Sequence, residues 1–299
     1  MKFDFVGRRK WWFLLSALLI IPGLISIAMQ GFNLGIDFTG GTLLDLKFSR
    51  PVTVTEVRAV LKEHQLENST IQLASTEQAE AAPNVFVRTN VLDEQQRRTV
   101  MADLQKKLGD FEVLRVEKVG AVIGSELTKQ AVLALIASWV LMIAYITYRF
   151  EFKFAIAGIL ALVHDILLVL GVFSMLHKEV DASFVAALLT IVGFSINDTI
   201  VIFDRIRENL KTYRKSEGLG ELVNKSIIQT MTRSIYTTLT VIFATASLYF
   251  FGGETTKNFS LALLIGFTAG AYSSIFNASQ LWVVFKEYSE GKRMPKPAK

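Results

Sequence analysis

The sequence predicts a polytopic α-helical membrane protein with six transmembrane helices and an α+β domain inserted between the first and second helices. Hydrophobic residues make up 51% of the 299 residues, and the mean hydropathy of +0.39 is too high for an ordinary soluble enzyme. Long uncharged blocks alternate with charged ones. Because these blocks show no strand alternation, and because only helices or closed barrels satisfy the backbone in lipid, we expect helices.

Six blocks are long enough for the ~20 residues that a bilayer demands. Three of them carry no formal charge, and each of the other three carries one, namely Asp165, Asp198 or Arg233. Trimmed to bilayer length, the predicted helices cover residues 11–29, 129–148, 154–176, 183–203, 230–251 and 260–284. Basic residues before the first block also describe a signal peptide, with Ser26-Ile27-Ala28 as a weak cleavage match, but the long apolar run favours a helix that is retained.

Lysine and arginine residues beside the helices indicate the orientation. The N-terminal segment, the 149–153 turn, the 204–229 loop and the tail from Lys286 hold 17 of them on one side, against Lys178 and Lys257 on the other. The positive-inside rule therefore places both termini in the cytoplasm and the insert outside. The net charge of +5 is dispersed over four segments, which argues against a nucleic-acid partner.

The insert has the composition of a soluble domain, since residues 30–129 carry 12 basic and 14 acidic side chains. The pattern predicts strands at 36–48, 70–75, 84–90 and 111–119, a helix at 53–65 opened by Thr53 and Glu56, and a helix at 94–108 capped by Asp93. This β-α-β-β-α-β order is that of the ferredoxin-like split βαβ sandwich. The predicted divisions are 1–29 with the first helix, 30–128 as the insert, 129–285 with helices two to six, and 286–299 as the tail.

Enzyme motifs are absent from the sequence. With three histidines and no cysteine, the chain holds no HExxH motif and no Cys-His pair, and it also lacks a phosphate loop and a GxSxG motif. We therefore expect no catalytic residue, no metal site and no cofactor. The Gly40-Gly41 pair predicts a turn or bulge in the first strand, because no helix-opening pattern with a lysine follows it.

Charges inside the predicted helices are the informative residues, because a carboxylate near the centre of a transmembrane helix costs about 2.5–3.5 kcal/mol on insertion scales and marks an ion route. Asp198 lies ~9 Å from the cytoplasmic end of its helix at 1.5 Å per residue. Arg233 falls at similar depth on the next helix, so the two could pair with each other or with a partner chain, and Asn197 and Thr237 could extend a hydrogen-bonded line. The alternative is a static salt bridge that only fixes helix packing.

His164 and Asp165 stand near the middle of the third helix. Adjacent residues on a helix point about 100° apart, which argues against a working pair. A role as buried hydrogen-bonding groups and a role in a proton relay both remain open, whereas His64 and His177 are expected to be solvated.

Two further patterns concern packing and the membrane surface. In the last helix, Gly266, Gly270 and Ser274 form a ridge of small residues that permits close helix approach. The 204–229 loop predicts a basic amphipathic segment at the membrane surface, with Leu222, Ile227 and Ile228 as its apolar side, and a docking site for a partner is the alternative.

Several motifs together resemble the SecF members of the SecD/SecF family of protein-export membrane proteins, within the RND superfamily. They are GIDFTGGT at 35–42, GAVIGSEL at 120–127, HD at 164–165, GFSINDTIVIFDRIRENL at 193–210, TRS at 232–234 and FGG at 251–253. The order of these motifs is that of the family over nearly the whole chain. Phe194 and Ser234 depart from the usual tyrosine and threonine, and neither change removes a charge.

The resemblance implies half of an RND-type unit in the bacterial inner membrane, with SecD as the other half and a periplasmic insert. It implies use of the proton motive force, or of sodium, to assist Sec-dependent export, with SecYEG, YajC, the preprotein and the lipid bilayer as partners. On that pattern Asp198 carries the proton, and Arg233 and Thr237 shape its path. An RND-like half-transporter for small solutes and a structural scaffold without transport are the alternatives.

Overall fold

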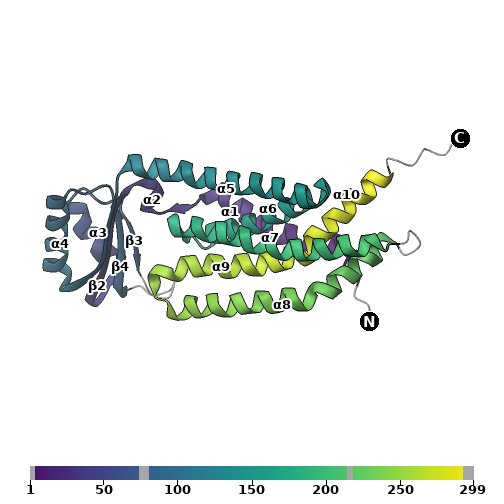
Figure 1. Cartoon of the computed structure of the whole chain (residues 1–299). Helices are drawn as coiled ribbons and strands as arrows, with labels where there is room; N and C mark the ends of the chain where they lie inside the picture. Colours follow the sequence, from purple (N-terminus) through teal and green to yellow (C-terminus); the bar gives the residue numbers. More distant parts are fainter. Residues whose placement is uncertain (1–3, 74–80, 214–217, 292–299) are drawn as a thin grey trace. The chain divides into compact units, whose positions relative to one another are not determined.

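The computed structural model describes residues 4–73, 81–213 and 218–291 (Figure 1). The chain forms two compact units. One comprises Met1–Asn33 and Leu133–Lys299 and is called the membrane unit below; the other, Leu34–Val132, is called the insert unit. Each unit is described by itself.

The insert unit contains a four-stranded antiparallel sheet and two long helices. In chain order the elements are β2 (Gly41–Thr53), α3 (Val54–Glu63), β3 (Thr70–Leu73), β4 (Ala81–Thr89), α4 (Glu94–Leu108) and β5 (Phe111–Val119). The strands pair in the order β3-β4-β2-β5. This arrangement is the split βαβ sandwich, so the predicted order of elements is confirmed.

A continuous apolar core joins the sheet to its two helices, which lie on one face of it (Figure 1). Leu44 and Leu46 of β2 are fully buried, as are Val57 of α3 and Leu104 of α4. Both helices begin at the predicted caps: Thr53 forms a capping box with Glu56, and Asp93 forms one with Gln96. Each box satisfies backbone N–H groups that have no partner within the helix.

The first predicted strand, 36–48, is wrong at its start. Residues Ile36–Thr39 form the short helix α2, which ends at Gly40 with φ 72°. Gly41 follows with φ 135°, and a Cβ there would lie 2.4 Å from the carbonyl oxygen of Thr89, so only glycine lets β2 begin beside β4. Gly40 therefore ends α2, and Gly41 is the first residue of β2, so the pair forms the turn at the start of the strand. Of the predicted strand 70–75, residues 74 and 75 lie outside the described part of the chain.

His64 also differs from the expectation of a solvated side chain. Its Nε2 lies 2.9 Å from Oδ2 of Asp103, and only 19% of the side chain is exposed. The contact joins the end of α3 to α4. His177, in contrast, is exposed, as expected.

Six helical stretches of the described chain are long and apolar enough to cross a membrane, which confirms the predicted number. The helices are α1 (Arg9–Gln30), α5 (Ala121–Arg149), α6 (Phe152–Met175), α7 (Ala182–Lys211), α8 (Leu219–Phe251), α9 (Glu254–Ser273) and α10 (Ser279–Gly291). A π-helical turn, η2 (Ser274–Ala278), joins α9 to α10, and these three form the sixth stretch. The two-residue strands β1 (Asn33–Leu34) and β6 (Glu179–Val180) complete the elements.

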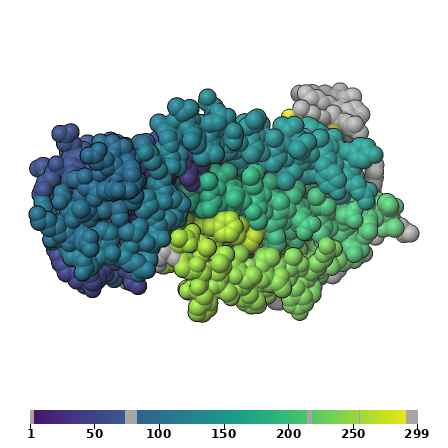
Figure 2. Space-filling model, turned by 60° about the vertical axis from the view of Figure 1, so that its left-hand side comes forward, coloured from purple at the N-terminus to yellow at the C-terminus, as the bar shows by residue number. Residues whose placement is uncertain are grey.

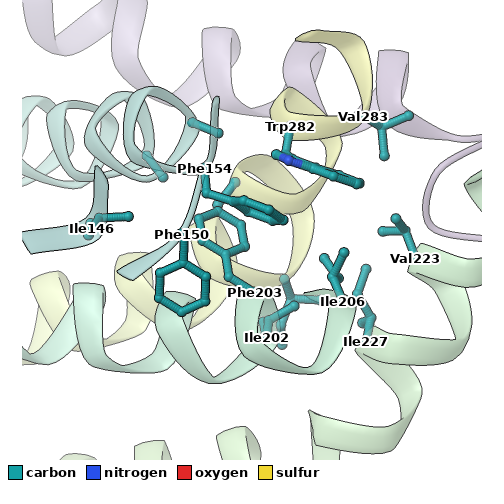
Figure 3. Close-up of a cluster of buried hydrophobic side chains, with 14 of the residues drawn as sticks. Ile146, Phe150, Phe154, Ile202, Phe203, Ile206, Val223, Ile227, Trp282 and Val283 are labelled. Atoms are coloured by element: carbon teal, nitrogen blue, oxygen red, sulfur yellow. The ribbon is translucent and has the colours of Figure 1, made fainter. Parts of the chain in front are cut away.

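The centre of the membrane unit is formed by α6, α7 and the sixth stretch, which are the most deeply buried of the spans. Much of α8 is exposed, and it forms one side of the face in Figure 2. Aromatic rings pack towards one end of the unit: Phe154 stacks on Trp282 at 4.6 Å between centroids and lies 4.8 Å from Phe203 (Figure 3). These rings tie α6 to α7 and α10.

Close approach of α7 and α9 confirms the predicted ridge of small residues. A Cβ at Gly266 would lie 2.3 Å from Ile191, and a Cβ at Gly270 would lie 2.9 Å from the Cβ of Ser195. Larger side chains at these positions would force the helices apart. This approach brings hydroxyl groups of α9 and η2 against α7.

The predicted surface segment 204–229 differs in the structure. Most of it continues α7 and begins α8, while residues 214–217 lie outside the described part. Leu222 and Ile227 are buried in the core, and of the three predicted apolar residues Ile228 is exposed. The segment before α1 covers this start of α8: backbone N–H groups of Phe5 and Val6 both donate to Oδ1 of Asn224 at 3.0 Å.

Candidate functional site

Asp198 lies on the buried face of α7 and is 7% exposed. Its Oδ1 accepts a hydrogen bond of 2.6 Å from the hydroxyl of Ser234 on α8. Its Oδ2 is buried and has no hydrogen-bond partner among the described residues. A hydrogen bond to a charged group contributes about 1.5–3 kcal/mol, and an unsatisfied buried polar atom costs a similar amount. Half of this carboxylate is therefore poorly stabilised as an anion.

Arg233 does not form the direct pair with Asp198 that the sequence allowed. Within the described ranges, no ion pair joins the two side chains, and Arg233 lies on an exposed face of α8. Thr237, one turn further on, is exposed on the same helix, and Asn197 is exposed on α7. Of these four predicted site residues, Asp198 is therefore buried, and the other three lie on the outside of the unit.

Ser234 is the contact that sequence reasoning missed. Arg233 and Ser234 are adjacent, so their side chains point about 100° apart, and the helix turns the hydroxyl inward while the guanidinium faces out. The sequence shows Ser234 only as a departure from the family's threonine. Its position next to Arg233 within an apolar block is the one signal that a small hydroxyl could face the neighbouring helix.

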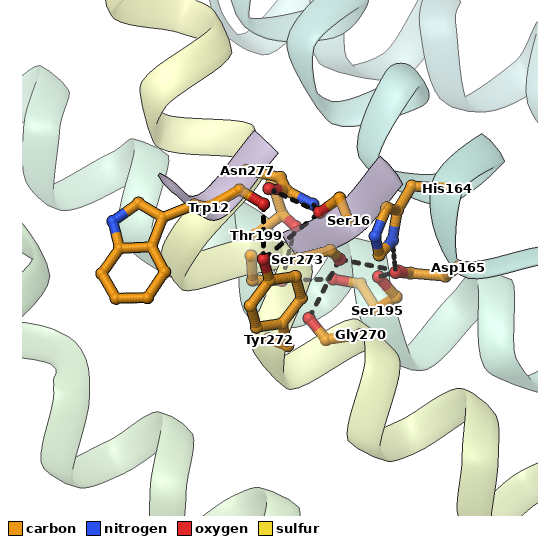
Figure 4. Close-up of polar contacts among 11 residues, drawn as sticks. Trp12, Ser16, His164, Asp165, Ser195, Thr199, Gly270, Tyr272, Ser273 and Asn277 are labelled. Atoms are coloured by element: carbon orange, nitrogen blue, oxygen red, sulfur yellow. Dashed lines mark hydrogen bonds and ion pairs between the residues drawn. The ribbon is translucent and has the colours of Figure 1, made fainter. Parts of the chain in front are cut away.

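A second buried carboxylate, Asp165 of α6, is much better satisfied (Figure 4). Its Oδ2 accepts hydrogen bonds from Ser195 of α7 at 2.6 Å and from Ser273 of α9 at 2.8 Å. Its Oδ1 lies 3.0 Å from Nδ1 of His164. The two neighbours therefore do contact each other, contrary to the expectation from their 100° separation.

Other hydroxyl contacts continue from this group. The hydroxyls of Thr199 on α7 and Ser274 on η2 lie 2.7 Å apart. On the side of α1, the Tyr272 hydroxyl donates to the backbone oxygen of Trp12 at 2.9 Å and lies 3.2 Å from the Ser16 hydroxyl (Figure 4). Asn277 of η2 donates to the same Ser16 hydroxyl at 2.9 Å.

Chemically, the membrane unit offers buried carboxylates, hydroxyls and one imidazole, which are groups that bind and pass protons. Ser195, Asp198 and Thr199 occupy one buried face of α7, spaced by three and four residues. Within the described residues, no group of three or more histidine, cysteine, aspartate and glutamate side chains could hold a metal ion. The arrangement is suited to proton exchange within a helix bundle.

Comparison with protein families gives two matches. Residues 99–288 match the family described as "Protein export membrane protein SecD/SecF, C-terminal", and residues 25–52 match the "SecD/SecF GG Motif". Among curated proteins, the chain is 54% identical to the protein translocase subunit SecF of Acidaminococcus fermentans, over 96% of this chain and 98% of that protein. It is 42% identical to the SecF of Alicyclobacillus acidocaldarius, over 97% and 95% of the two chains.

Two solved structures are similar over almost the whole chain. The crystal structure of SecDF from Thermus thermophilus, described as a translocon-associated membrane protein, matches with a TM-score of 0.87 and 36% identity. SecDF in a super-membrane-facing form matches with a TM-score of 0.72 and 36% identity. The match covers 96% of this chain but 39% of the first SecDF chain, and 98% against 40% for the second.

Proposed function

Because the chain belongs to the SecD/SecF family of protein-export membrane proteins, we propose that it is the SecF subunit of a SecD–SecF complex driven by the proton motive force. Membership of the family gives it a role in protein export. The proposal adds that a proton gradient assists Sec-dependent movement of preproteins across the bacterial inner membrane. Since the chain spans about two fifths of the SecDF chains it matches, SecD would provide the other half of the unit.

The observation that carries the proposal is the half-satisfied carboxylate of Asp198. An anion at this depth with one donor and one unpartnered oxygen is costly, whereas a protonated carboxyl group is neutral and can still accept from Ser234. Asp198 would therefore alternate between a charged and a neutral form as protons cross. Each change would alter the attraction between α7 and the helices around it.

Arg233 and Thr237 would guide this proton from the exposed face of α8, with Asn197 of α7 as a secondary contributor. A guanidinium at this depth is costly when it faces lipid, so we infer that polar groups of SecD cover this face. SecYEG, YajC and the preprotein are further proposed partners, and they follow from the family alone. The proton is the proposed coupling ion, with sodium as the alternative.

The proposed location is the inner membrane, with both termini in the cytoplasm and the insert unit in the periplasm. The bias of lysine and arginine towards one side supports this orientation. A half-transporter for small solutes is a weaker candidate because one insert of about 100 residues leaves little material for a substrate cleft. A scaffold without transport would tolerate replacement of Asp198 by an amide.

The test is gradient-dependent export by vesicles that contain SecD and the Asp198→Asn variant. Asparagine keeps the shape of the side chain but cannot cycle its charge, so the gradient-dependent part of export is expected to be lost while the complex still assembles. Asp204→Asn is the matched control, because Asp204 lies on the same helix and its exposed carboxylate pairs with Arg207. Normal export by Asp198→Asn under a proton gradient would refute the proposal. If Asp198→Asn lost only the part of export that a sodium gradient drives, sodium would be identified as the coupling ion.

A further inference from the structure

We propose that His164 and Asp165 form a second proton-binding site, in which His164 takes the proton and Asp165 supplies the counter-charge. The proposal deepens the proton-driven function and rests on it. It assigns a role to a buried pair that the Asp198 mechanism does not use, and it concerns α6, α7 and α9 instead of α7 and α8.

The surroundings of Asp165 supply donors for a charged carboxylate. It is fully buried, yet two hydroxyls and one imidazole are directed at its two oxygens within 3.0 Å. Ser195 and Ser273 come from different helices, so the carboxylate also ties α6 to both α7 and α9. These three donors stabilise the charged form of the carboxylate against the cost of burying it.

His164 has an open position for a proton. Its side chain is more than nine-tenths buried, and its Nε2 has no hydrogen-bond partner among the residues the structure describes. When the imidazole is neutral and its Nδ1–H donates to Asp165, the lone pair of Nε2 is free. A proton that binds there gives an imidazolium beside the carboxylate, no other bond changes, and the pair becomes neutral overall.

The groups around the pair are few. From α9, Tyr272 is titratable, and its ring centroid lies 5.9 Å from that of His164. From α7, Asp198 lies one turn beyond Ser195. The uncharged Ser16 of α1 and Asn277 of η2 lie on the other side (Figure 4). Tyr272, Ser16 and Asn277 form a hydrogen-bonded group on the α1 side.

The π-helical turn supplies an independent reason to expect function here. Such turns are rare and occur frequently at functional sites. Ser273, which donates to Asp165, immediately precedes η2, and Ser274, which contacts Thr199, begins it. The turn therefore meets the face of α7 that carries Asp198, and Ser195 and Asp198 are separated by ~4.5 Å along the axis. Protonation of the His164–Asp165 pair would therefore affect the same turn of α7 as protonation of Asp198.

The direct test is nitrogen NMR of the SecD–SecF complex in lipid nanodiscs, with ¹⁵N-labelled histidine. The His64→Gln and His177→Gln variants assign the remaining signal to His164. We expect His164 to carry its proton on Nδ1 at high pH and to become doubly protonated as the pH is lowered. In Asp165→Asn, the doubly protonated form is expected to be lost. A His164 signal that stays in one form throughout in the unmutated complex would overturn the proposal.

A second measurement separates proton binding from packing. Ser195→Ala removes a donor to Asp165 without adding bulk, and we expect it to shift the pH profile of gradient-dependent export. Thr190→Ala is the control, since this exposed hydroxyl of α7 bonds its own helix at Ala186. An unchanged profile with reduced protein levels would make the pair structural and refute the proposal. If Asp198→Asn exported normally while His164 still exchanged its proton, the Asp198 mechanism would fail and the proton site would stand.

Discussion

Replacement of Gly270 by alanine tests the close approach of α7 and α9. The new Cβ would lie 2.9 Å from the Cβ of Ser195 and 3.3 Å from its Cα. Carbon atoms pack best at about 3.5–4.0 Å, and a backbone atom cannot swing aside as the end of a long side chain can. The helices must therefore separate, and overpacking of this kind typically costs about 1–3 kcal/mol. Gly270→Ala is expected to lower the free energy of unfolding by this amount.

A double-mutant cycle identifies the cause. Ser195→Gly alone should cost about 1 kcal/mol for a glycine within a helix, plus about 1.5–3 kcal/mol for the hydrogen bond lost to Asp165. Ser195→Gly also removes the Cβ with which the new Cβ of Gly270→Ala would clash. The double variant should therefore be more stable than the sum of the single effects predicts, by most of the overpacking cost.

Unfolding of the purified chain in mixed micelles, followed by tryptophan fluorescence, measures these energies, because Trp282 is fully buried. Gly193→Ala is the control: no heavy atom lies within 4 Å of a Cβ at this position of α7, so the change should be neutral or stabilising. If the losses in free energy of unfolding from Gly270→Ala and Ser195→Gly simply added in the double variant, the clash between positions 270 and 195 would be refuted as the cause.

Two further predictions concern the insert and the orientation of the chain. The fragment 33–119 should fold alone and melt cooperatively. Within it, hydrogen bonds from the Thr53 backbone and hydroxyl lower the pKa of Glu56 from 4.5, so its charge stabilises the fold above that pH and the effect is lost as the pH falls through the lowered value. Glu56→Gln, which can keep the cap, should be less stable than the parent at neutral pH and equal to it in acid; a constant difference would contradict this. In the cysteine-free chain, a single cysteine near Lys215 should resist a membrane-impermeant reagent added from outside, and labelling there would refute the six-span orientation.

Features with a local cause were predicted well from the sequence. The capping boxes at Thr53 and Asp93 depend on residues three positions apart, and both are present. The number of spans follows from the length and hydropathy of each block. The start of the first strand was wrong because Ile36–Thr39 form a short helix. Glycine is required at position 41 by a contact with Thr89 on a neighbouring strand, which the sequence near residue 41 does not reveal.

The candidate site was predicted less completely because contacts depend on how each helix is rotated about its axis. A shift of one residue turns a side chain by about 100°, which is the difference between outward Arg233 and inward Ser234. The sequence identified Asp198, His164 and Asp165 as unusual charges in apolar blocks. It could not show that Ser195 and Ser273 come from separate helices to meet Asp165, and it gave no indication of the π-helical turn.

The π-helical turn η2 also determines the direction in which the side chains of α10 point. A π-helical turn holds one residue more than an α-helical turn, so the side chains of α10 are displaced by about 100° from where an unbroken continuation of α9 would direct them. Trp282 consequently reaches Phe154 of α6. If Ser274–Ala278 became α-helical with all of its residues kept, Trp282 would be rotated by about 100° away from Phe154, whereas deletion of one residue within this turn would offset that rotation. The additional residue rotates α10 relative to α9, so the two parts of this span direct their side chains towards different neighbours.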